Sequence, residues 1–346
     1  MLIENKKVLV TGGAGFIGSN LVDALVKRGN DVVVLDDLST GKEDNLKDAF
    51  ATGKARLVIG SILDYDLVCS VTAGADVVMH LAVQCLRLSF DRPNYVHEVN
   101  ATGTLNVLCA AHAQGSVERF AYVSSSEVYG TAETAPMSES HPLRPTTVYG
   151  ASKLAGELYT QAFHRTYGFP ALVIRPFNTY GYREHHEGAS GEVIPRFALK
   201  LLNGLSPVVF GDGLQTRDFT FVTETAEGII RATECDELIG QAANLARGQE
   251  ASIMQVAATL KALLGKEHIP VEFKPERPAD VRRHYADVRL LKELTGFRPR
   301  IDLPEGLKKY LDWLQKAHPE VSALLAECQT ENWNLANAEV LAKASR

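Results

Sequence analysis

The sequence predicts an α/β protein built on a doubly wound parallel sheet, and two observations support this fold class. Through the first half of the chain, short and nearly all-apolar segments alternate with amphipathic ones, as parallel strands covered by helices on both faces do. The first apolar segment also runs into a glycine turn, with Gly12, Gly15 and Gly18, and then into an apolar-periodic segment. A strand, a tight turn and a helix in this order begin a βαβ unit.

The pattern predicts a larger sheet domain followed by a smaller lobe. Strands are expected at 8–11, 32–36, 56–60, 76–82, 119–125 and 171–176. Helices are expected between them at 16–28, 65–71, 95–114 and 149–167. After residue 176 glycine and proline become more frequent, and the clear helical patterns are 193–203 and 252–265. We therefore predict a sheet domain over 1–176 to which 220–246 returns, an irregular α/β substrate lobe over 177–315, and a helical tail over 316–346.

The glycine turn is a candidate dinucleotide site. Glycines there let the backbone approach a pyrophosphate, which the N–H groups at the start of the helix bind. The second expected strand ends in Asp36, 24 positions after Gly12, where a carboxylate accepts hydrogen bonds from the adenosine ribose. An acid there favours NAD over NADP, whose ribose phosphate it repels. Because Asp37 follows directly, either of the two aspartates can be the one that binds the ribose. The sequence thus predicts a Rossmann-type NAD-binding domain.

Composition limits the class of protein further. The 346 residues are 45% hydrophobic and 23% charged, with 36 basic and 42 acidic side chains and a net charge of −6. This balance argues against nucleic acid or a membrane surface as a partner.

The sequence also predicts a location. The first strand begins by residue 7, and we find neither a signal peptide nor an apolar run of membrane length, so a cytoplasmic location is expected. The scattered cysteines predict free thiols in a reducing compartment: Cys69, Cys85, Cys109, Cys235 and Cys328.

A second cluster predicts catalysis. The strand at 119–125 runs into the segment SSSEVYG (124–130), and the carboxyl ends of parallel strands face the ligand crevice. Further on, Tyr149 and Lys153 are four residues apart and share one helix face. Lys153 can stabilise the phenolate of Tyr149, which can then take a proton from a hydroxyl group that Ser125 also binds. The alternatives are a tyrosine–lysine spacing that arises by chance and serines that merely cap the end of the strand. Because the serine cluster and the tyrosine–lysine pair both follow a dinucleotide turn, catalysis is favoured.

These residues carry a family resemblance. The chain resembles an extended short-chain dehydrogenase/reductase of the NAD-dependent sugar-nucleotide epimerase/dehydratase group, and is most similar to UDP-glucose and UDP-glucuronate 4-epimerases. The matching segments span about 7–314: TGGAGFIGSN (11–20), VVVLDDLSTG (32–41), DVVMHLA (76–82), NATGTLNVL (100–108), SSSEVYG (124–130), YGASK (149–153), RPFNTYG (175–181), VIPRF (193–197), GDGLQTRDFTFV (211–222) and RPADVRRHYAD (277–287).

The resemblance implies roles for individual residues. The implied catalytic residues are Ser125, Tyr149, Lys153 and, as a further candidate, Glu127. The implied cofactor site comprises Gly12, Gly15, Phe16, Ile17, Gly18, Asp36, Asp37, Ser39, Gly41, Ser61, Ile62, Leu81, Ala82, Asn100, Tyr149, Lys153 and Pro176. The implied substrate contacts are Ser126, Val193 and, at the diphosphate, Asn178, Arg217 and Arg282. For Arg217 an ion pair with Asp218 is the alternative. The resemblance also implies a homodimer that pairs the helices at 95–114 and 149–167.

The chain departs from the family pattern in places. Gly60-Ser61 stands where the family has Gly-Asp, and Val83 is followed by the unusual segment Gln84-Cys85-Leu86-Arg87. We expect 85–91 and the loop 182–192 to line the sugar pocket, where Arg87, Arg183 and His186 are candidates to pair with a uronate. No metal is assigned to His185-His186, because the loop offers no other placed ligands.

Glu127 leaves the reaction open. Members of the group first oxidise C4 of a hexose to a 4-keto sugar; a 4-epimerase then needs only room for that sugar to turn over. A glutamate two places before Tyr129 is typical of dehydratases and decarboxylases, whereas a structural carboxylate would bond loop amides. The motifs at 215–222 and 277–287 are most like those of 4-epimerases. We therefore expect an NAD-dependent UDP-hexose or UDP-hexuronate 4-epimerase, with a 4,6-dehydratase or UDP-glucuronate decarboxylase as the alternative. The intact Ser125, Tyr149 and Lys153 disfavour a non-enzymatic NAD-binding protein.

Overall fold

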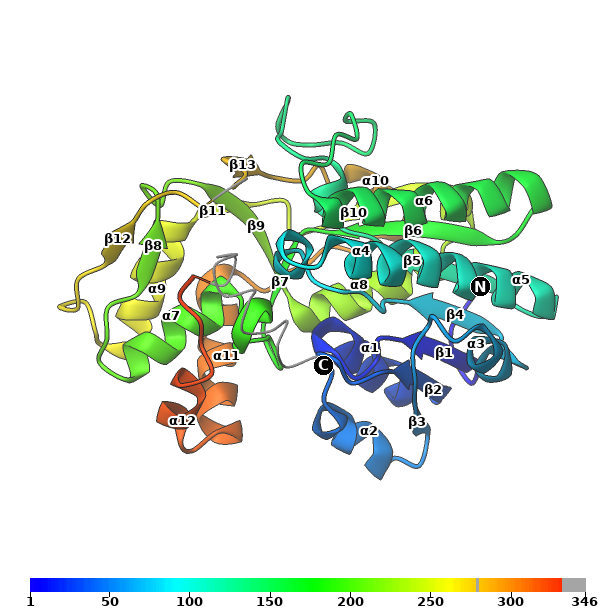
Figure 1. Cartoon of the computed structure of the whole chain (residues 1–346), viewed down its shortest axis with the longest axis horizontal. Helices are drawn as coiled ribbons and strands as arrows, with labels where there is room; N and C mark the ends of the chain where they lie inside the picture. The colour runs from blue at the N-terminus through cyan, green and yellow to red at the C-terminus, as the bar shows by residue number, and fades with distance from the viewer. Residues whose placement is uncertain (278–279, 332–346) are drawn as a thin grey trace.

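The fold is a seven-stranded parallel sheet with a smaller lobe beside it (Figure 1). The computed structural model describes residues 1–277 and 280–331. The strand order is β10-β6-β5-β4-β1-β2-β3, which confirms the predicted α/β class. The strands are β1 (Lys7–Thr11), β2 (Asp31–Asp36), β3 (Ala55–Ile59), β4 (Val77–His80), β5 (Arg119–Val123), β6 (Ala171–Pro176) and β10 (Ala242–Leu245).

Helices cover both faces of this sheet. In β1, Val8 and Val10 belong to one apolar core, whereas Leu9 between them belongs to the other, because side chains alternate along a strand. The helices on the first core are α1 (Phe16–Lys27), α2 (Lys47–Ala51), α8 (Val222–Glu234) and α10 (Arg289–Thr295). The helices on the second are α3 (Tyr65–Thr72), α4 (Pro93–His97), α5 (Thr104–Gln114) and α6 (Val148–Tyr167).

The smaller lobe has its own apolar core. Around β9 (Thr216–Phe221) lie β7 (Asn178–Tyr180), β11 (Glu250–Ser252) and β13 (Arg283–His284), and β8 (Val208–Phe210) pairs with β12 (Glu272–Lys274). Its helices are α7 (Val193–Leu202), α9 (Ile253–Leu264), α11 (Leu303–Ala317) and α12 (Val321–Leu325). The remaining short helices are η1 (Glu43–Leu46), η2 (Arg87–Phe90), η3 (Glu98–Gly103), η4 (Ser126–Val128), η5 (Gly188–Ser190) and η6 (Asp236–Leu238).

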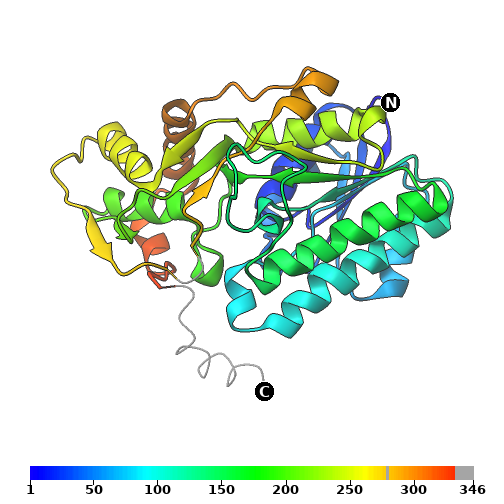
Figure 2. The same ribbon diagram turned by 90° about the horizontal axis from the view of Figure 1, so that it is seen from above.

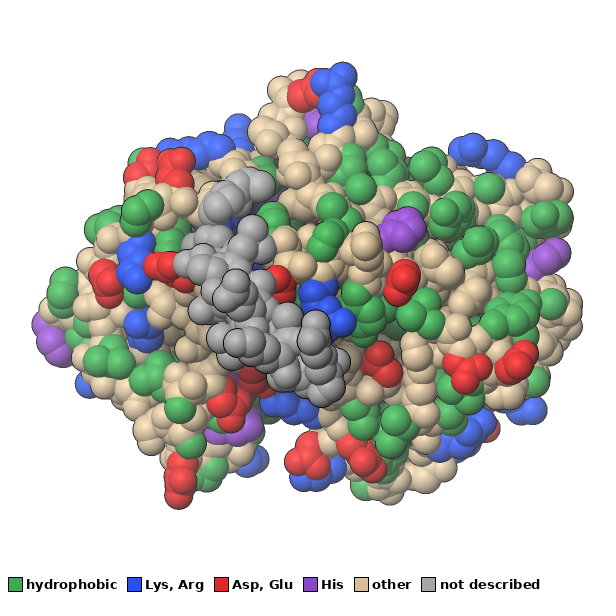
Figure 3. Space-filling model, viewed as in Figure 1, with side chains coloured by type: hydrophobic (Ala, Val, Ile, Leu, Met, Phe, Trp, Pro, Cys, Tyr) green, Lys and Arg blue, Asp and Glu red, His purple; other side chains and the backbone are tan. Residues whose placement is uncertain are grey.

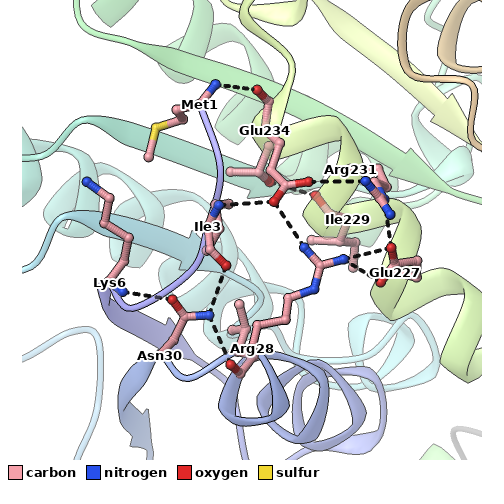
Figure 4. A network of polar contacts seen from close by, with 11 residues as sticks. Met1, Ile3, Lys6, Arg28, Asn30, Glu227, Ile229, Arg231 and Glu234 are labelled. Carbon is pink, nitrogen blue, oxygen red and sulfur yellow. Dashed lines mark hydrogen bonds and ion pairs between the residues drawn. The ribbon is translucent and has the colours of Figure 1, made fainter.

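The chain returns from the smaller lobe to the large sheet through α8 and β10. Arg28, after α1, binds Glu227 (2.7 Å) and Glu234 (3.0 Å) on α8, and Asn30 binds the carbonyl oxygen of Ile3 (3.0 Å), as Figure 4 shows. β10 pairs with β6 at the edge of the sheet. Helix α8 and β10, which lie within the expected return at 220–246, thus join the large sheet, and the division of the chain into domains stays a prediction.

The structure differs from the expected helices in several places; among them, α2 and α10 were not expected. The segment 95–114 is interrupted, because η3 is a π-helical turn between α4 and α5. Helix α8 was not expected: it begins directly after β9 and has no side-chain cap. Helix α11 was also missed, although Asp302 caps it and a proline follows in its first turn. In the predicted helical tail, α12 lies at Val321–Leu325, and 332–346 lies outside the described residues.

The surface carries charges of both signs. On the face drawn in Figure 3, acidic and basic side chains are interspersed among polar and apolar ones. Within 1–277 and 280–331, every helix is too short or too polar to cross a membrane. The cytoplasmic location and the absence of a nucleic-acid partner stay predictions.

A buried ion pair fastens α6 to the sheet. Arg175 on β6 makes a forked contact with Glu157 on α6 (3.0 and 2.6 Å), and their side chains are 3% and 1% exposed. Arg175 also donates to the hydroxyl of Tyr129 (2.8 Å), which donates to Asn244 on β10 (2.6 Å). The network therefore joins α6, β6, β10 and the segment after β5.

We expect Glu157→Gln to lower the free energy of unfolding by about 3–5 kcal/mol, because the buried Arg175 loses its carboxylate. Urea denaturation measures this change. The matched control is Lys309→Gln, whose partner Glu305 lies on the exposed side of α11, and it should change the free energy by less than about 0.5 kcal/mol. A loss below about 1 kcal/mol for Glu157→Gln would contradict the role of the pair.

Candidate active site

A cavity of about 410 Å³ lies at the carboxyl ends of the parallel strands and extends into the smaller lobe. Most of the predicted site residues line it: Gly12, Gly15, Phe16, Ile17, Gly18, Asp36, Asp37, Ser39, Ile62, Leu81, Ala82, Ser125, Ser126, Glu127, Tyr149, Lys153, Pro176, Asn178, Val193 and Arg217. Four predicted residues lie outside this lining: Gly41, Ser61, Asn100 and Arg282.

The glycine turn forms one end of the cavity and has no room for side chains. Gly12 has a φ of +70°, and a Cβ there would lie 2.6 Å from the backbone nitrogen of Ala82. A Cβ on Gly18 would overlap the carbonyl oxygen of Gly12. Gly15 caps α1 without a side-chain hydrogen bond, which leaves the first N–H groups of the helix for a ligand. This cradle fits the pyrophosphate of a dinucleotide.

Asp36 ends β2 beneath the glycine turn. Its carboxylate accepts hydrogen bonds from the backbone N–H groups of Ala14 and Leu38, both at 2.9 Å. Burial raises the pKa of Asp36, and these two bonds oppose the rise. A Cβ on Gly41 would lie 2.8 Å from the same carboxylate, so Gly41 makes room for Asp36 although it does not line the cavity. Asp37 lines the cavity as well and accepts from the N–H of Ser39 (2.9 Å).

The structure brings Ser125, Tyr149 and Lys153 together at the end of β5. Ser125 follows β5 in extended conformation and hydrogen-bonds Tyr149. Tyr149 lies in the first turn of α6, and Lys153 follows one turn later. Lys153 Nζ donates to the carbonyl oxygen of Val123 (2.8 Å) and lies 4.4 Å from the centre of the Tyr122 ring. Sequence spacing placed the pair on one helix face; the fold places Ser125 opposite them.

Electrostatics around this group depend on burial. Burial raises the pKa of Tyr149, the hydrogen bond with Ser125 lowers it, and the neighbouring Glu127 raises it further. Burial also lowers the pKa of Lys153 to about 7. The Tyr149 phenol is therefore protonated until a nearby positive charge stabilises its phenolate.

Arginines from the smaller lobe line the opposite end of the cavity. Arg217 and Arg277 share the carboxylate of Asp280, at 2.6 and 2.8 Å. The ion pair of Arg217 with Asp218 that we considered is not formed; Asp218 instead accepts backbone N–H groups, including that of Gly248 (3.1 Å). Arg196 donates to the carbonyl oxygen of Thr330 (2.8 Å) and lines the cavity too.

Arg282 requires a correction. We expected it at the diphosphate, but it binds Asp212 (2.7 Å) outside the cavity, and its side chain is 57% exposed. Arg277 and Arg196 were missed, although both lie in quoted segments, at the start of 277–287 and within 193–197. Spacing alone did not distinguish the arginine that faces the cavity from its neighbours.

Asn100 acts from behind the cavity wall. It lies in the π-helical turn η3 and is 1% exposed. Its oxygen accepts from the N–H of Gln84 (2.8 Å), and its nitrogen donates to Ser152 on α6 (3.0 Å). Asn100 thereby ties the segment before η2 to the helix of Tyr149. Ser61 accepts from the N–H of Leu63 (3.1 Å), beside the lining residue Ile62.

The three candidate uronate partners each form an ion pair within the protein, and of the three only Arg87 lines the cavity. Arg183 pairs with Asp23 (2.8 Å), His186 with Glu327 (3.2 Å) and Arg87 with Glu192 (2.8 Å). Ligand atoms of His186, Glu187 and Glu327 lie within 4.8 Å of one another, a spacing that could hold a metal ion. Glu187 already contacts Lys42, however, so we keep the prediction of no metal.

A glycine cradle, a serine–tyrosine–lysine group and several arginines thus line one cavity, an arrangement that suits a dinucleotide-dependent enzyme. The sequence model of the family described as GDP-mannose 4,6 dehydratase matches residues 9–310, and the chain belongs to this family of extended short-chain dehydrogenase/reductases. Its members are NAD-dependent sugar-nucleotide epimerases and dehydratases, and this chain is an enzyme of that class.

Similar proteins include both kinds of enzyme. A UDP-glucose 4-epimerase of Mycolicibacterium smegmatis is 36% identical over 312 residues, 89% of this chain and 98% of the relative. A UDP-N-acetylglucosamine 4-epimerase of Methanobrevibacter ruminantium, solved with UDP-N-acetylmuramic acid, is 33% identical with a TM-score of 0.85 over 91% of this chain and 99% of that one. A dTDP-glucose 4,6-dehydratase of Streptomyces venezuelae, solved with NAD, is 30% identical with a TM-score of 0.86 over 92% and 99%.

The depressed pKa of Lys153 predicts a pH dependence of the NAD-free protein. Between pH 7 and 9 the unfolded chain binds a proton at Lys153 that the folded chain has lost, so this residue makes stability rise with pH, by about 2 kcal/mol. We expect Lys153→Met to remove that rise in the free energy of unfolding, measured by urea denaturation at pH 7, 8 and 9. Parallel curves for the parent and Lys153→Met would show that Lys153 keeps an ordinary pKa.

Proposed function

We propose that this enzyme is an NAD-dependent nucleotide-sugar 4-epimerase acting on a UDP-sugar through a transient 4-keto intermediate. The observation that carries the proposal is the grouping of Ser125, Tyr149 and Lys153 between the glycine cradle and the arginine-lined end. The similarity of the 4-epimerases over nearly the whole chain supports the choice of reaction.

The residues present fit NAD. The cradle of Gly12, Gly15 and Gly18 would hold the pyrophosphate, and Asp36 the adenosine ribose. Lys153 would hold the nicotinamide ribose, in exchange for its present bond to Val123. Bound NAD supplies a hydride acceptor at C4 and a positive charge near Tyr149.

The side chains of the chain itself then move the proton. With that added charge and Lys153 nearby, Tyr149 becomes the base that takes the proton from the 4-hydroxyl group. Ser125 binds the same oxygen and holds it against Tyr149. After the 4-keto sugar turns over, the hydride that the cofactor would hold would return to the opposite face of C4 and Tyr149 would return the proton to the oxygen, so the net change would be inversion at C4.

The far end of the cavity suits a nucleoside diphosphate. Arg217, Arg277 and Arg196 present planar guanidinium groups, which match phosphate oxygens. The amide oxygens of Asn178 and Gln215 are buried without a hydrogen-bond partner among the described residues, which supports a polar ligand between them.

A 4,6-dehydratase is the second candidate, and Glu127 is the observation that favours it. Glu127 lines the cavity, and burial raises its pKa against the opposing charges of Arg217 and Arg277. A carboxyl group at this place, with its pKa raised, could donate a proton to a leaving hydroxyl group.

We also propose a homodimer and a cytoplasmic location. Helices α5 and α6 lie side by side along one face of the sheet (Figure 2), and α6 exposes Leu158. An exposed apolar side chain on this pair of helices supports packing against a second copy.

We expect Tyr149→Phe to lower kcat at least about 10³-fold while NAD stays bound, because the variant lacks only the phenol oxygen. Turnover of UDP-glucose and NAD content after purification measure the two effects. Val148→Ala, next in the chain and 42% exposed, is the control and should keep its activity. Undiminished turnover by Tyr149→Phe would remove the mechanism.

The mass of the product separates the two candidates. Incubation with UDP-glucose, UDP-N-acetylglucosamine or UDP-glucuronate should give a new chromatographic peak of unchanged mass, and Glu127→Gln should keep kcat within about tenfold. Loss of water or carbon dioxide, abolished by Glu127→Gln, would instead establish a dehydratase or decarboxylase.

A further inference from the structure

Segment 318–331 lies beyond the part of the chain that the family model matches, which ends at residue 310. It follows α11 in the smaller lobe and contains α12. Helix α12 contacts α7 (Figure 1), and four half-buried side chains of the segment pack against the apolar core of the smaller lobe: Val321, Leu324, Leu325 and Cys328. The segment is therefore a packed part of this lobe, although it lies outside the family match.

Glu327 anchors the segment to the loop 182–192. Its backbone carbonyl oxygen accepts a hydrogen bond from the N–H of Gly188 (3.0 Å), and its carboxylate lies 3.2 Å from Nε2 of His186. Residues 190–192 of the same loop line the cavity. The end of the segment is thus held beside the cavity wall, and Thr330 follows three residues after the anchor.

Arg196 on α7 links the segment to the cavity, which its side chain helps to line. Its Nη2 donates to the carbonyl oxygen of Thr330 (2.8 Å), and its guanidinium carbon lies 5.9 Å from the centre of the Phe210 ring. Burial lowers the pKa of Arg196 to about 10, so the guanidinium stays charged at neutral pH. A guanidinium has five N–H donors, and the bond to Thr330 uses one of them.

We propose that segment 318–331 is a positioning element of the substrate site, which holds Arg196 at the cavity for the diphosphate of a nucleotide sugar. A long arginine side chain loses rotamer freedom when it is fixed in one place. Because Thr330 fixes the guanidinium before a ligand arrives, less of that loss falls on the binding step. This inference rests on the proposed function, in which Arg196 contacts the diphosphate, and adds the element that places it there.

Calorimetric titration of the NAD-loaded full-length enzyme with UDP tests the proposal. Leu324→Asp places a charge where α12 packs on the apolar core, and we expect UDP to bind at least about tenfold more weakly. Ala323→Asp is the matched control, because it adds the same charge on the exposed side of α12, and it should change the affinity by less than about twofold.

The outcomes of this titration separate the two proposals. Unchanged UDP binding by Leu324→Asp, with UDP bound normally by the parent, would overturn the role of the segment and leave the proposed function intact. Failure of the parent to bind UDP would overturn both. Loss of NAD from Leu324→Asp would show a general disruption of the fold and would also overturn a role confined to the substrate.

A double-mutant cycle shows whether the segment acts through Arg196. Arg196→Ala should weaken UDP binding by itself, and Leu324→Asp on that background should weaken it further by less than about twofold, because the residue that the segment positions is already gone. A merely structural effect of Leu324→Asp would instead multiply with that of Arg196→Ala. Independent losses of this kind would overturn the proposal.

Discussion

The buried ion pair between Arg175 and Glu157 is the constraint on which the active site depends. Helix α6 carries both Tyr149 and Lys153, and this pair is its charged link to β6. Both charges are removed from water, so they are stable only while they face one another. Because Arg175 also binds Tyr129, the segment that carries Ser125 and Glu127 is held by the same network. The position of Ser125 relative to the helix of Tyr149 and Lys153 is thus supported by a contact outside the cavity.

Both lobes contribute polar groups to one cavity. The large sheet ends in backbone N–H groups and buried polar side chains, which suit a dinucleotide. The smaller lobe adds Arg217 and Arg277, which both bind the carboxylate of Asp280. Arg87, which also lines the cavity, is paired with Glu192. The charged groups of the cavity are therefore held by partners from several elements of the fold.

The parallel sheet and the serine–tyrosine–lysine group could be predicted because their signals are local. Short apolar runs identify strands, and a four-residue spacing identifies one helix face. The π-helical turn at Glu98–Gly103 could not be predicted in this way, since the apolar pattern on each side of it is that of an ordinary helix. Helix α8 was missed because it follows β9 without a capping side chain, and only its packing on α1 fixes its start.

The sequence by itself determined the fold class and the glycine cradle and pointed to the candidate reacting side chains, because each depends on neighbours along the chain. The tertiary structure decided which arginine lines the cavity, Arg277 rather than Arg282, and that the lining residue Arg87 is already paired. These outcomes depend on partners far apart in sequence, such as Arg87 with Glu192 and Arg282 with Asp212. Charge compensation across the fold, and not residue type, decides what a side chain can still bind.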